Sequence, residues 1–417
     1  QAPASLDVAR YWRLLDDPVL TQLVEAALAN NLDLAQSAAR LDQARAQLAG
    51  TRAGYLPQVS GSGRAQQDLL DNAADDPLIS LGADASWELD LFGRIGANVA
   101  ASQADLAAAG YSLADLQRVI AGQVALATIS ARATAQQLAT ARDTLNYQDE
   151  NLQIARWRVQ AGLVSSLDVE QARGQRAQTA ATIPLLESNL ASTANAISTL
   201  IGEPPGRVLR LLEAPAAIPT PPAVAGFEAP AEVLRRRPDV RGAEASLVAS
   251  MARIDVARAQ LLPAIQLGGT VGTSSLGLGN LFDVITGGVF GTRAQIDSAR
   301  AAAQGSLAAW RQSILGALED VESAAVDLDR SGQRVDIYAE ALDAANNSAI
   351  LARSQYQAGL SDFQNLLTSE NQLLSARNAQ VGAEADRASA FVRLTQALGG
   401  GWSPADYPLP ISDGTEQ

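Results

Sequence analysis

The feature that most constrains this chain is that it contains two copies of one unit. Leu56-Pro57 recurs as Leu262-Pro263, at an offset of 206 residues. Further along, Gln160-Ala161-Gly162-Leu163 recurs as Gln357-Ala358-Gly359-Leu360, at an offset of 197. Self-similarity at fixed offsets is typical of a repeated structural unit. We therefore expect one fold unit used twice, with nine residues fewer in the second copy, the difference between the two offsets.

Each copy is predicted to contain a helix, a β-hairpin, a very long helix and a further helix, which makes the fold mainly α with a small β part. In the first copy these helices span about 18–53, 96–160 and 167–200, and in the second copy the long helix spans about 294–357. About 63 helical residues form a rod of roughly 95 Å, which a globular core does not need. The expected layout is an N-terminal extended segment at 1–17, repeat 1 at 18–202 with its hairpin at about 55–92, a proline-rich connector at 203–230, repeat 2 at 231–402 with its hairpin at about 263–292, and a tail at 403–417.

The strand-like segment from Ile79 to Phe92 alternates between apolar and polar residues almost strictly. Successive strand side chains point to opposite faces, so one face is apolar and the other acidic. Two interpretations are open: a half-buried hairpin on a soluble helical protein, or a transmembrane strand that faces lipid and a lumen. Four strands are too few to enclose a lumen, so the second interpretation requires a barrel shared between chains. The lumen candidates are Asp84, Glu88 and Asp90, and Trp87 is either an interfacial anchor or a core aromatic.

The second hairpin departs from the first. Its sequence passes from Phe290-Gly291-Thr292 directly to Arg293 and the long helix, without a counterpart of the full strand at 79–92. We therefore expect most of the returning strand to be missing, by removal of residues rather than by natural deletion. A barrel with such a gap would leave unpaired strand edges in lipid, which is costly.

Composition excludes several classes of function. The chain has no histidine, no cysteine and no lysine, so histidine-based acid–base catalysis and His/Cys metal sites are impossible. A net charge of −14 argues against nucleic-acid binding. No phosphate-binding Gly-Lys-Ser/Thr loop or carboxylate pair stands out, so we expect no enzyme activity, no cofactor and no metal. No run of 18 apolar residues occurs, and any signal peptide is expected to have been removed.

Four motifs together resemble the outer-membrane factor family, the TolC/OprM-like exit ducts of Gram-negative bacteria, and within it the NodT-like lipoprotein branch. They are Trp87-Glu88-Leu89-Asp90-Leu91-Phe92-Gly93-Arg94, Ile201-Gly202-Glu203-Pro204-Pro205, Arg236-Arg237-Pro238-Asp239-Val240 and Ala397-Leu398-Gly399-Gly400-Gly401-Trp402. The resemblance covers nearly the whole chain. Members of this branch usually carry a lipid-bearing cysteine near the mature N-terminus, and this sequence has none, so we expect either that it begins after that cysteine or that the protein is not lipidated.

The resemblance implies a homotrimer in the outer membrane, in which a 12-stranded β-barrel stands on a 12-helix α-barrel that crosses the periplasm. It also implies a passive exit channel for drugs or small molecules in a tripartite (RND-type) efflux system, with a periplasmic adaptor protein and an inner-membrane RND transporter as partners. The alternative is a soluble helical scaffold or interaction protein without a pore.

The turns that end the two long helices are the candidate functional tips. By resemblance they form the periplasmic mouth and contact the adaptor through Gly162, Leu163, Val164, Ser165, Gly359, Leu360 and Ser361. Ser165 with Asp168, and Ser361 with Gln364, fit capping boxes. The family's gate positions after the second tip correspond to Gln364 and Thr368, and Asp362 and Glu370 are nearby acids that could form a pore ring. The alternative for each acid is a solvated carboxylate favoured by the helix dipole.

Overall fold

The computed structural model describes residues 8–66, 78–214, 216–222, 236–272, 275–277, 283–285 and 289–403. The start of the predicted N-terminal segment, part of the connector and the tail after residue 403 lie outside this range. The chain divides into two compact units, which are treated separately below: residues 1–36, 114–237 and 316–406 form unit 1, and residues 37–113, 238–315 and 407–417 form unit 2.

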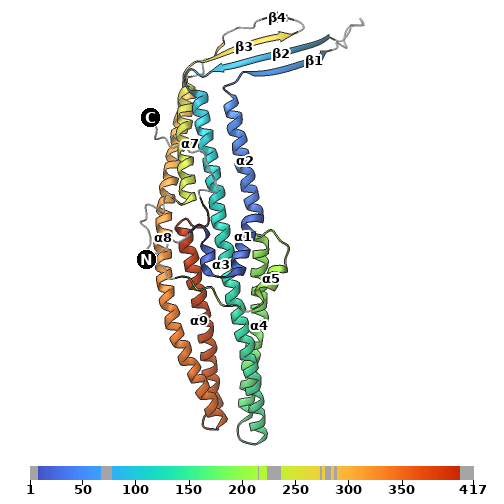
Figure 1. The fold of residues 1–417 in the computed structure, drawn as a ribbon, viewed down its shortest axis with the longest axis vertical. Coiled ribbons are helices and arrows are strands. Elements are labelled where there is room, and N and C mark those ends of the chain that lie inside the picture. Colours follow the sequence, from blue (N-terminus) through green and yellow to red (C-terminus); the bar gives the residue numbers. More distant parts are fainter. Residues whose placement is uncertain are drawn as a thin grey trace. The chain divides into compact units, whose positions relative to one another are not determined.

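Helices dominate the described residues (Figure 1). The first element is a 3₁₀ helix, η1, which spans Val8–Leu15. The α-helices that follow are α1 Pro18–Asn30, α2 Leu32–Ala53, α3 Arg94–Gln160, α4 Ser166–Leu200, α5 Arg207–Leu212, α7 Pro238–Ala259, α8 Val289–Gln357 and α9 Phe363–Ala397. The two long helices contain 67 and 69 residues, or roughly 100 Å each. No helix in the described ranges is both long enough and apolar enough to cross a membrane.

The expectation of one helix over residues 18–53 is wrong, because the helix is interrupted at Asn31. Asn31 has an extended backbone, with ψ at 130°. Its side-chain oxygen accepts hydrogen bonds from the amides of Asp33 (2.9 Å) and Leu34 (3.0 Å), as an N-cap does. Because an asparagine can satisfy the first amides of the second helix, a helix end and a helix start follow each other without a loop.

In the described part of unit 2, five strands form one antiparallel sheet, with the order β1-β2-β3-β4 and β5 also paired with β3 (Figure 1). The strands are β1 Gln58–Gln66, β2 Leu78–Leu89, β3 Ala264–Gly272, β4 Ser275–Gly277 and β5 Asp283–Ile285. Gly61, Ala83 and Val271 lie in register on the three long strands, and so do Ser60, Asp84 and Thr270. The register therefore keeps the apolar and polar faces separate across the whole sheet, as the alternation predicts.

The nine-residue difference between the copies equals the difference in spacing between the strands of the two hairpins. Eleven positions, 67–77, separate β1 from β2, whereas only two, 273–274, separate β3 from β4. The register then resumes, because β4 begins at Ser275, 197 residues after Leu78. β4 and β5 pair with opposite ends of β3. β4 and β5 have three residues each, against twelve in β2, and positions 278–282 and 286–288 lie outside the described residues, so the mostly missing returning strand stays a prediction.

The core of unit 1 anchors the N-terminal part of the chain. Asp17 begins α1: its Oδ1 accepts the amide of Val19 (2.8 Å), and its Oδ2 accepts Nε of Arg132 in α3 (3.2 Å). Both charged side chains are more than nine-tenths buried. Tyr11 is completely buried, and burial raises the pKa of its hydroxyl. Asp17 is the N-cap of α1, and the preceding Asp16 takes a positive φ of 51°.

Candidate functional site

The two helical hairpins of unit 1, α3–α4 and α8–α9, end in turns of the same geometry. Gly162 and Gly359 have φ angles of +70° and +73°, a conformation that favours glycine. The amides of Leu163 and Leu360 each donate to the carbonyl five residues earlier, at 2.9 Å. This is the Schellman arrangement, which closes a helix by satisfying its last carbonyls. The sequence repeat thus places the same turn at both tips.

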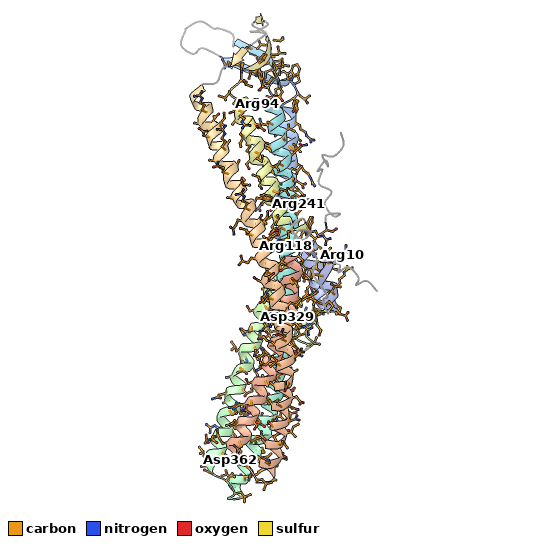
Figure 2. The ribbon with its side chains drawn as sticks, turned by 90° about the vertical axis from the view of Figure 1, so that its left-hand side faces the viewer. Arg10, Arg94, Arg118, Arg241, Asp329 and Asp362 are labelled. Carbon is orange, nitrogen blue, oxygen red and sulfur yellow. The ribbon has the colours of Figure 1, made fainter. Side chains whose placement is uncertain are left out.

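The two hairpins differ in how their second helix begins. Ser165 is the N-cap of α4, as predicted, and accepts the amide of Leu167 at 3.1 Å. The N-cap of α9 is Asp362, which is labelled near the tip of the hairpin in Figure 2, so the predicted Ser361 cap is wrong by one residue. The Asp362 carboxylate accepts the amide of Asn365 at 2.9 Å. A carboxylate caps as well as a hydroxyl and also interacts favourably with the helix dipole, which explains the shift.

Most of the predicted tip residues are solvent-accessible in the single chain. Leu163 is 68% exposed and Leu360 is 81% exposed, which is unusual for leucine. Exposed with them are Gly162, Ser165 and Gly359, while Val164 and Ser361 are half-buried. The tips therefore offer apolar and polar groups to another molecule.

The four predicted gate residues do not lie in one environment. Asp362, Gln364 and Thr368 are exposed, and the Thr368 hydroxyl donates to the Gln364 carbonyl at 2.8 Å. Glu370, by contrast, is only 8% exposed. Glu370 is therefore part of the packing between helices in this structure, while the other three remain available to a pore or a partner.

Glu370 is held by donors from two other helices. Its Oε1 accepts Nδ2 of Asn151 from α3 at 2.8 Å and Nε of Arg353 from α8 at 3.1 Å. The Arg353 guanidinium also lies over the ring of Tyr147, with 4.7 Å between its carbon and the ring centroid. A buried carboxylate is tolerable when it is paired and hydrogen-bonded in this way. These contacts tie the α8–α9 hairpin to α3.

A second polar contact joins the hairpins nearer the turn. Arg158 of α3 donates through Nη1 to the carbonyl of Tyr356 at 2.9 Å, and its guanidinium lies 4.5 Å from that ring's centroid. The Tyr356 ring is buried and meets Phe363 edge to face, at 5.6 Å. Burial raises the pKa of the Tyr356 hydroxyl, and the nearby Arg158 charge opposes the rise. Arg158 thus caps the carboxyl end of α8 from a different helix.

Sequence reasoning did not identify Asn151, Arg158, Arg353 or Tyr356. One signal was present: at the repeat offset of 197, Arg173 in the first copy corresponds to Glu370 in the second. A charge reversal between equivalent positions indicates that the two copies have different neighbours there.

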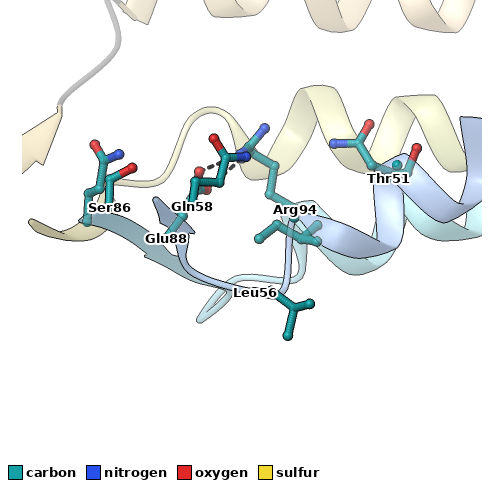
Figure 3. Close-up of a pocket in the computed structure, with 11 residues that line it drawn as sticks. Thr51, Leu56, Gln58, Ser86, Glu88 and Arg94 are labelled. Atoms are coloured by element: carbon teal, nitrogen blue, oxygen red, sulfur yellow. Dashed lines mark hydrogen bonds and ion pairs between the residues drawn. The ribbon is translucent and has the colours of Figure 1, made fainter. Parts of the chain in front are cut away.

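The other candidate region is the junction of β2 with α3 (Figure 3). Glu88 binds Arg94 through two hydrogen bonds, of 2.8 and 2.5 Å. The Asp90 carboxylate accepts the amides of Ile95 (3.0 Å) and Gly96 (2.8 Å) at the start of α3. Two of the three predicted lumen acids therefore fix the strand to the helix, while Asp84 remains exposed on the polar face.

A polar pocket of about 320 Å³ lies beside this junction (Figure 3). Trp87 points to the other face of β2, where its Nε1 donates to the Tyr55 carbonyl at 2.9 Å. The residues that line the pocket are Gly50, Thr51, Gly54, Leu56, Gln58, Ser86, Glu88, Arg94, Ile95, Asn98 and Gln266. No cluster of acids able to hold a metal ion occurs among the described residues.

Comparison with known proteins gives this architecture a class. Residues 23–203 and 229–400 each match the family described as "Outer membrane efflux protein". The chain therefore belongs to the outer membrane efflux protein family, and the two matched segments cover most of both sequence repeats.

Individual relatives agree with that assignment. The chain is 31% identical to Nodulation protein T of Rhizobium leguminosarum bv. trifolii, over 95% of this chain and 89% of that protein. It is 30% identical to the pyoverdine export outer membrane protein OpmQ of Pseudomonas aeruginosa, over 98% and 90%. Its fold is similar to that of the outer-membrane channel OprN, with a TM-score of 0.82, 32% identity and coverage of 94% and 93%.

Family membership confirms the predicted class and location. The protein is an efflux channel component of the Gram-negative outer membrane that extends into the periplasm, and it belongs to a transport family rather than to an enzyme family.

Proposed function

We propose that this chain is the outer-membrane exit channel of a tripartite RND-type efflux system. Three copies form an α-barrel joined to a shared transmembrane β-barrel, and drugs or other small molecules pass through it without bond chemistry. A periplasmic adaptor protein and an inner-membrane RND transporter supply the remaining parts and the energy.

The observation that carries this proposal is the exposed apolar face of the sheet. Val59, Ile79, Leu81 and Val271 lie on this face, and their exposed fractions are between 59% and 74%. An exposed apolar surface of this kind marks contact with lipid or with another protein. The opposite face carries Asp84 and other polar groups, which suits an aqueous lumen.

The free edge of β1 supports assembly from several copies. β1 pairs with β2 on one side, and no described strand pairs with its other side. Unpaired strand edges are costly in lipid, so a strand from another copy is the natural partner. Repeated head-to-tail pairing of this kind closes into a ring when the rotation permits it.

The gate belongs, in this proposal, to the tips of the helical hairpins. Asp362, Gln364 and Thr368 are exposed and supply the pore-facing polar groups of the α8–α9 tip. Glu370 acts differently: with Arg353 and Asn151 it holds that hairpin against α3 in the closed arrangement. Opening requires these polar contacts to break.

The test is the mass of the detergent-purified protein by light scattering, together with restoration of efflux in a Gram-negative strain deleted for its own exit channel. The proposal predicts a stable trimer, extraction from the outer membrane only by detergent, and restored drug resistance. A monomer that is soluble without detergent and fails to restore efflux would instead support the scaffold alternative.

A further inference from the structure

The polar pocket beside the junction of β2 with α3 offers hydrogen bonds without a net charge. It holds about 320 Å³, at the small end of the range for ligand pockets. Its polar lining consists of amides and hydroxyls together with one ion pair, Glu88–Arg94. Both carboxylate oxygens of Glu88 accept hydrogen bonds from the Arg94 guanidinium, so the two charges neutralise each other within the protein.

Four side chains that line this pocket have unused hydrogen-bonding capacity. They are Gln58 on β1, Ser86 on β2, Asn98 on α3 and Gln266 on β3. No hydrogen bond from any of these side chains to another described residue is found. Gln58 and Ser86 are paired in register and point to the same side of the sheet as Glu88 (Figure 3). Since amides and hydroxyls both donate and accept, the pocket fits a ligand group that also does both.

A glycine in the last turn of α2 leaves part of this space open. A Cβ at Gly50 would meet no protein atom within 4 Å, so close packing does not require glycine there. Glycine is also a poorer helix former than alanine. Gly50 therefore weakens its helix without a reason in the packing, and it leaves open a part of the pocket that a side chain would fill.

The second copy does not keep this lining. Three of the pocket positions have apolar residues at the offset of 206: Gly50 corresponds to Val256, Thr51 to Ala257 and Gln58 to Ala264. A requirement of the repeated fold would act on both copies alike. The open, polar lining therefore belongs to the first copy alone and is not dictated by the fold.

We propose that this pocket binds an uncharged, polyhydroxylated group of the cargo, such as a sugar ring, during passage through the channel. Its amides and hydroxyls exchange hydrogen bonds with the hydroxyls of the ligand, and the neutralised Glu88–Arg94 pair gives a charged group no counterion. The contact is weak, because the cargo has to leave the pocket as well as enter it. This inference rests on the proposed function, because the polar face of the sheet lines a lumen only in a shared barrel.

The experiment measures binding of one probe, D-glucose, to the full-length protein by saturation-transfer NMR. The protein is purified in lauryldimethylamine oxide, because a detergent with a sugar head group would compete for the pocket. Glucuronate and glucosamine test the chemical class of the ligand, because they carry a negative and a positive charge on the same ring. Trimer mass and bilayer conductance establish that each protein sample is assembled.

Two matched pairs of variants separate the pocket from its surroundings. Ser86→Ala and Ser62→Ala make the same change on the polar face of the sheet, and only Ser86 lines the pocket. Gly50→Ala and Gly305→Ala each add a methyl group at an exposed helical position with no protein atom within 4 Å. Of these two glycines, only Gly50 lines the pocket.

We expect glucose to bind at least about fivefold more tightly than either charged analogue. Ser86→Ala should weaken glucose binding about threefold and Asn98→Leu about tenfold, because each removes a hydrogen-bonding group. Gly50→Ala should weaken it at least about fivefold without lowering the melting temperature, since alanine favours the helix. Ser62→Ala and Gly305→Ala should bind glucose as the wild type does.

The inference is overturned if an assembled, conducting wild type does not bind glucose, or if a charged analogue binds more tightly. It is also overturned if Ser86→Ala and Ser62→Ala have equal affinities, or if Gly50→Ala binds as the wild type does. A wild type that forms no trimer and carries no current contradicts the proposed function instead. Glucose binding by such a protein would keep the pocket and remove only its role in the channel, so the two failures are distinguishable.

Discussion

The two hairpin tips show how one turn can serve two different purposes. Both end in a Schellman turn with glycine at positive φ, and the equivalent residues Arg156 and Arg353 are both retained. Arg353 nevertheless binds the buried Glu370, whereas Arg156 is exposed. Repetition thus fixes the backbone of the tip. A few substitutions then decide whether the tip is tied to its neighbour within the chain or left exposed.

The largest predicted effect is that of Glu370→Arg, which gives the second helical hairpin the residue that the first has at the equivalent position, Arg173. Glu370→Arg would place two guanidinium groups together in a mostly buried site, because Arg353 loses its carboxylate. We expect the free energy of opening of the α8–α9 hairpin to fall by about 3 kcal/mol, within the range found when a buried ion pair is broken. Hydrogen exchange of the α9 amides measures this.

The reciprocal change is its control. Arg173→Glu alters an exposed side chain whose ion pair with Glu170 contributes less than about 1 kcal/mol. The α3–α4 hairpin should therefore exchange as in the wild type. Equal effects at the two positions would contradict the distinction between a tied tip and a free tip.

An intermediate effect is predicted for the turns themselves. Gly162→Ala and Gly359→Ala each force a Cβ into a left-handed conformation, which costs roughly 1–2 kcal/mol. Since the two turns have the same geometry, both hairpins should lose a similar amount, as read from exchange of the Leu163 and Leu360 amides. A loss of stability at only one turn would show that equal turn geometry in the two repeats does not give equal turn stability.

The smallest effect is a pH dependence confined to the second tip. Burial raises the pKa of Tyr356 above that of an unfolded tyrosine, so the proton is held more tightly in the folded hairpin. This stabilisation is present below the unfolded pKa of about 10 and is lost as the pH rises above it. Val159 occupies the equivalent position in the first copy and cannot titrate.

Tyr356→Phe provides the control for that prediction. Among the described residues no hydrogen-bond partner is found for the buried Tyr356 hydroxyl, so its removal should cost little stability at neutral pH. The variant should also lose the alkaline loosening of the α8–α9 tip, as measured by limited proteolysis between pH 8 and pH 11. Persistence of the loosening in the variant would assign it to another group.

Much of the fold follows from periodicity and from a few punctuating residues. The two-residue period of β2 predicts which residues share a face of the sheet, and the register agrees. Glycines at 162 and 359 predict the hairpin turns because positive φ selects glycine. These signals are local, so a single sequence contains them.

The polar contacts between hairpins are not local. Asn151 and Glu370 are 219 positions apart, and nothing in either segment specifies the other as its partner. The second β-hairpin gives another example: counting residues back from α8 indicates a mostly missing strand, and the described residues add that β4 and β5 pair with opposite ends of β3. Pairing of this kind depends on distant residues, so counting along the chain does not show it.

The most direct test of the account is the single-channel conductance of the purified protein in a planar bilayer, with Glu370→Gln compared with the wild type. Glu370→Gln removes the charge that holds Arg353 while keeping the size of the side chain. The account predicts discrete channels in both samples, with longer or larger openings in the variant because the α8–α9 tip is less firmly tied to α3. Bilayers that stay silent with both proteins, or variant openings identical to those of the wild type, would contradict it.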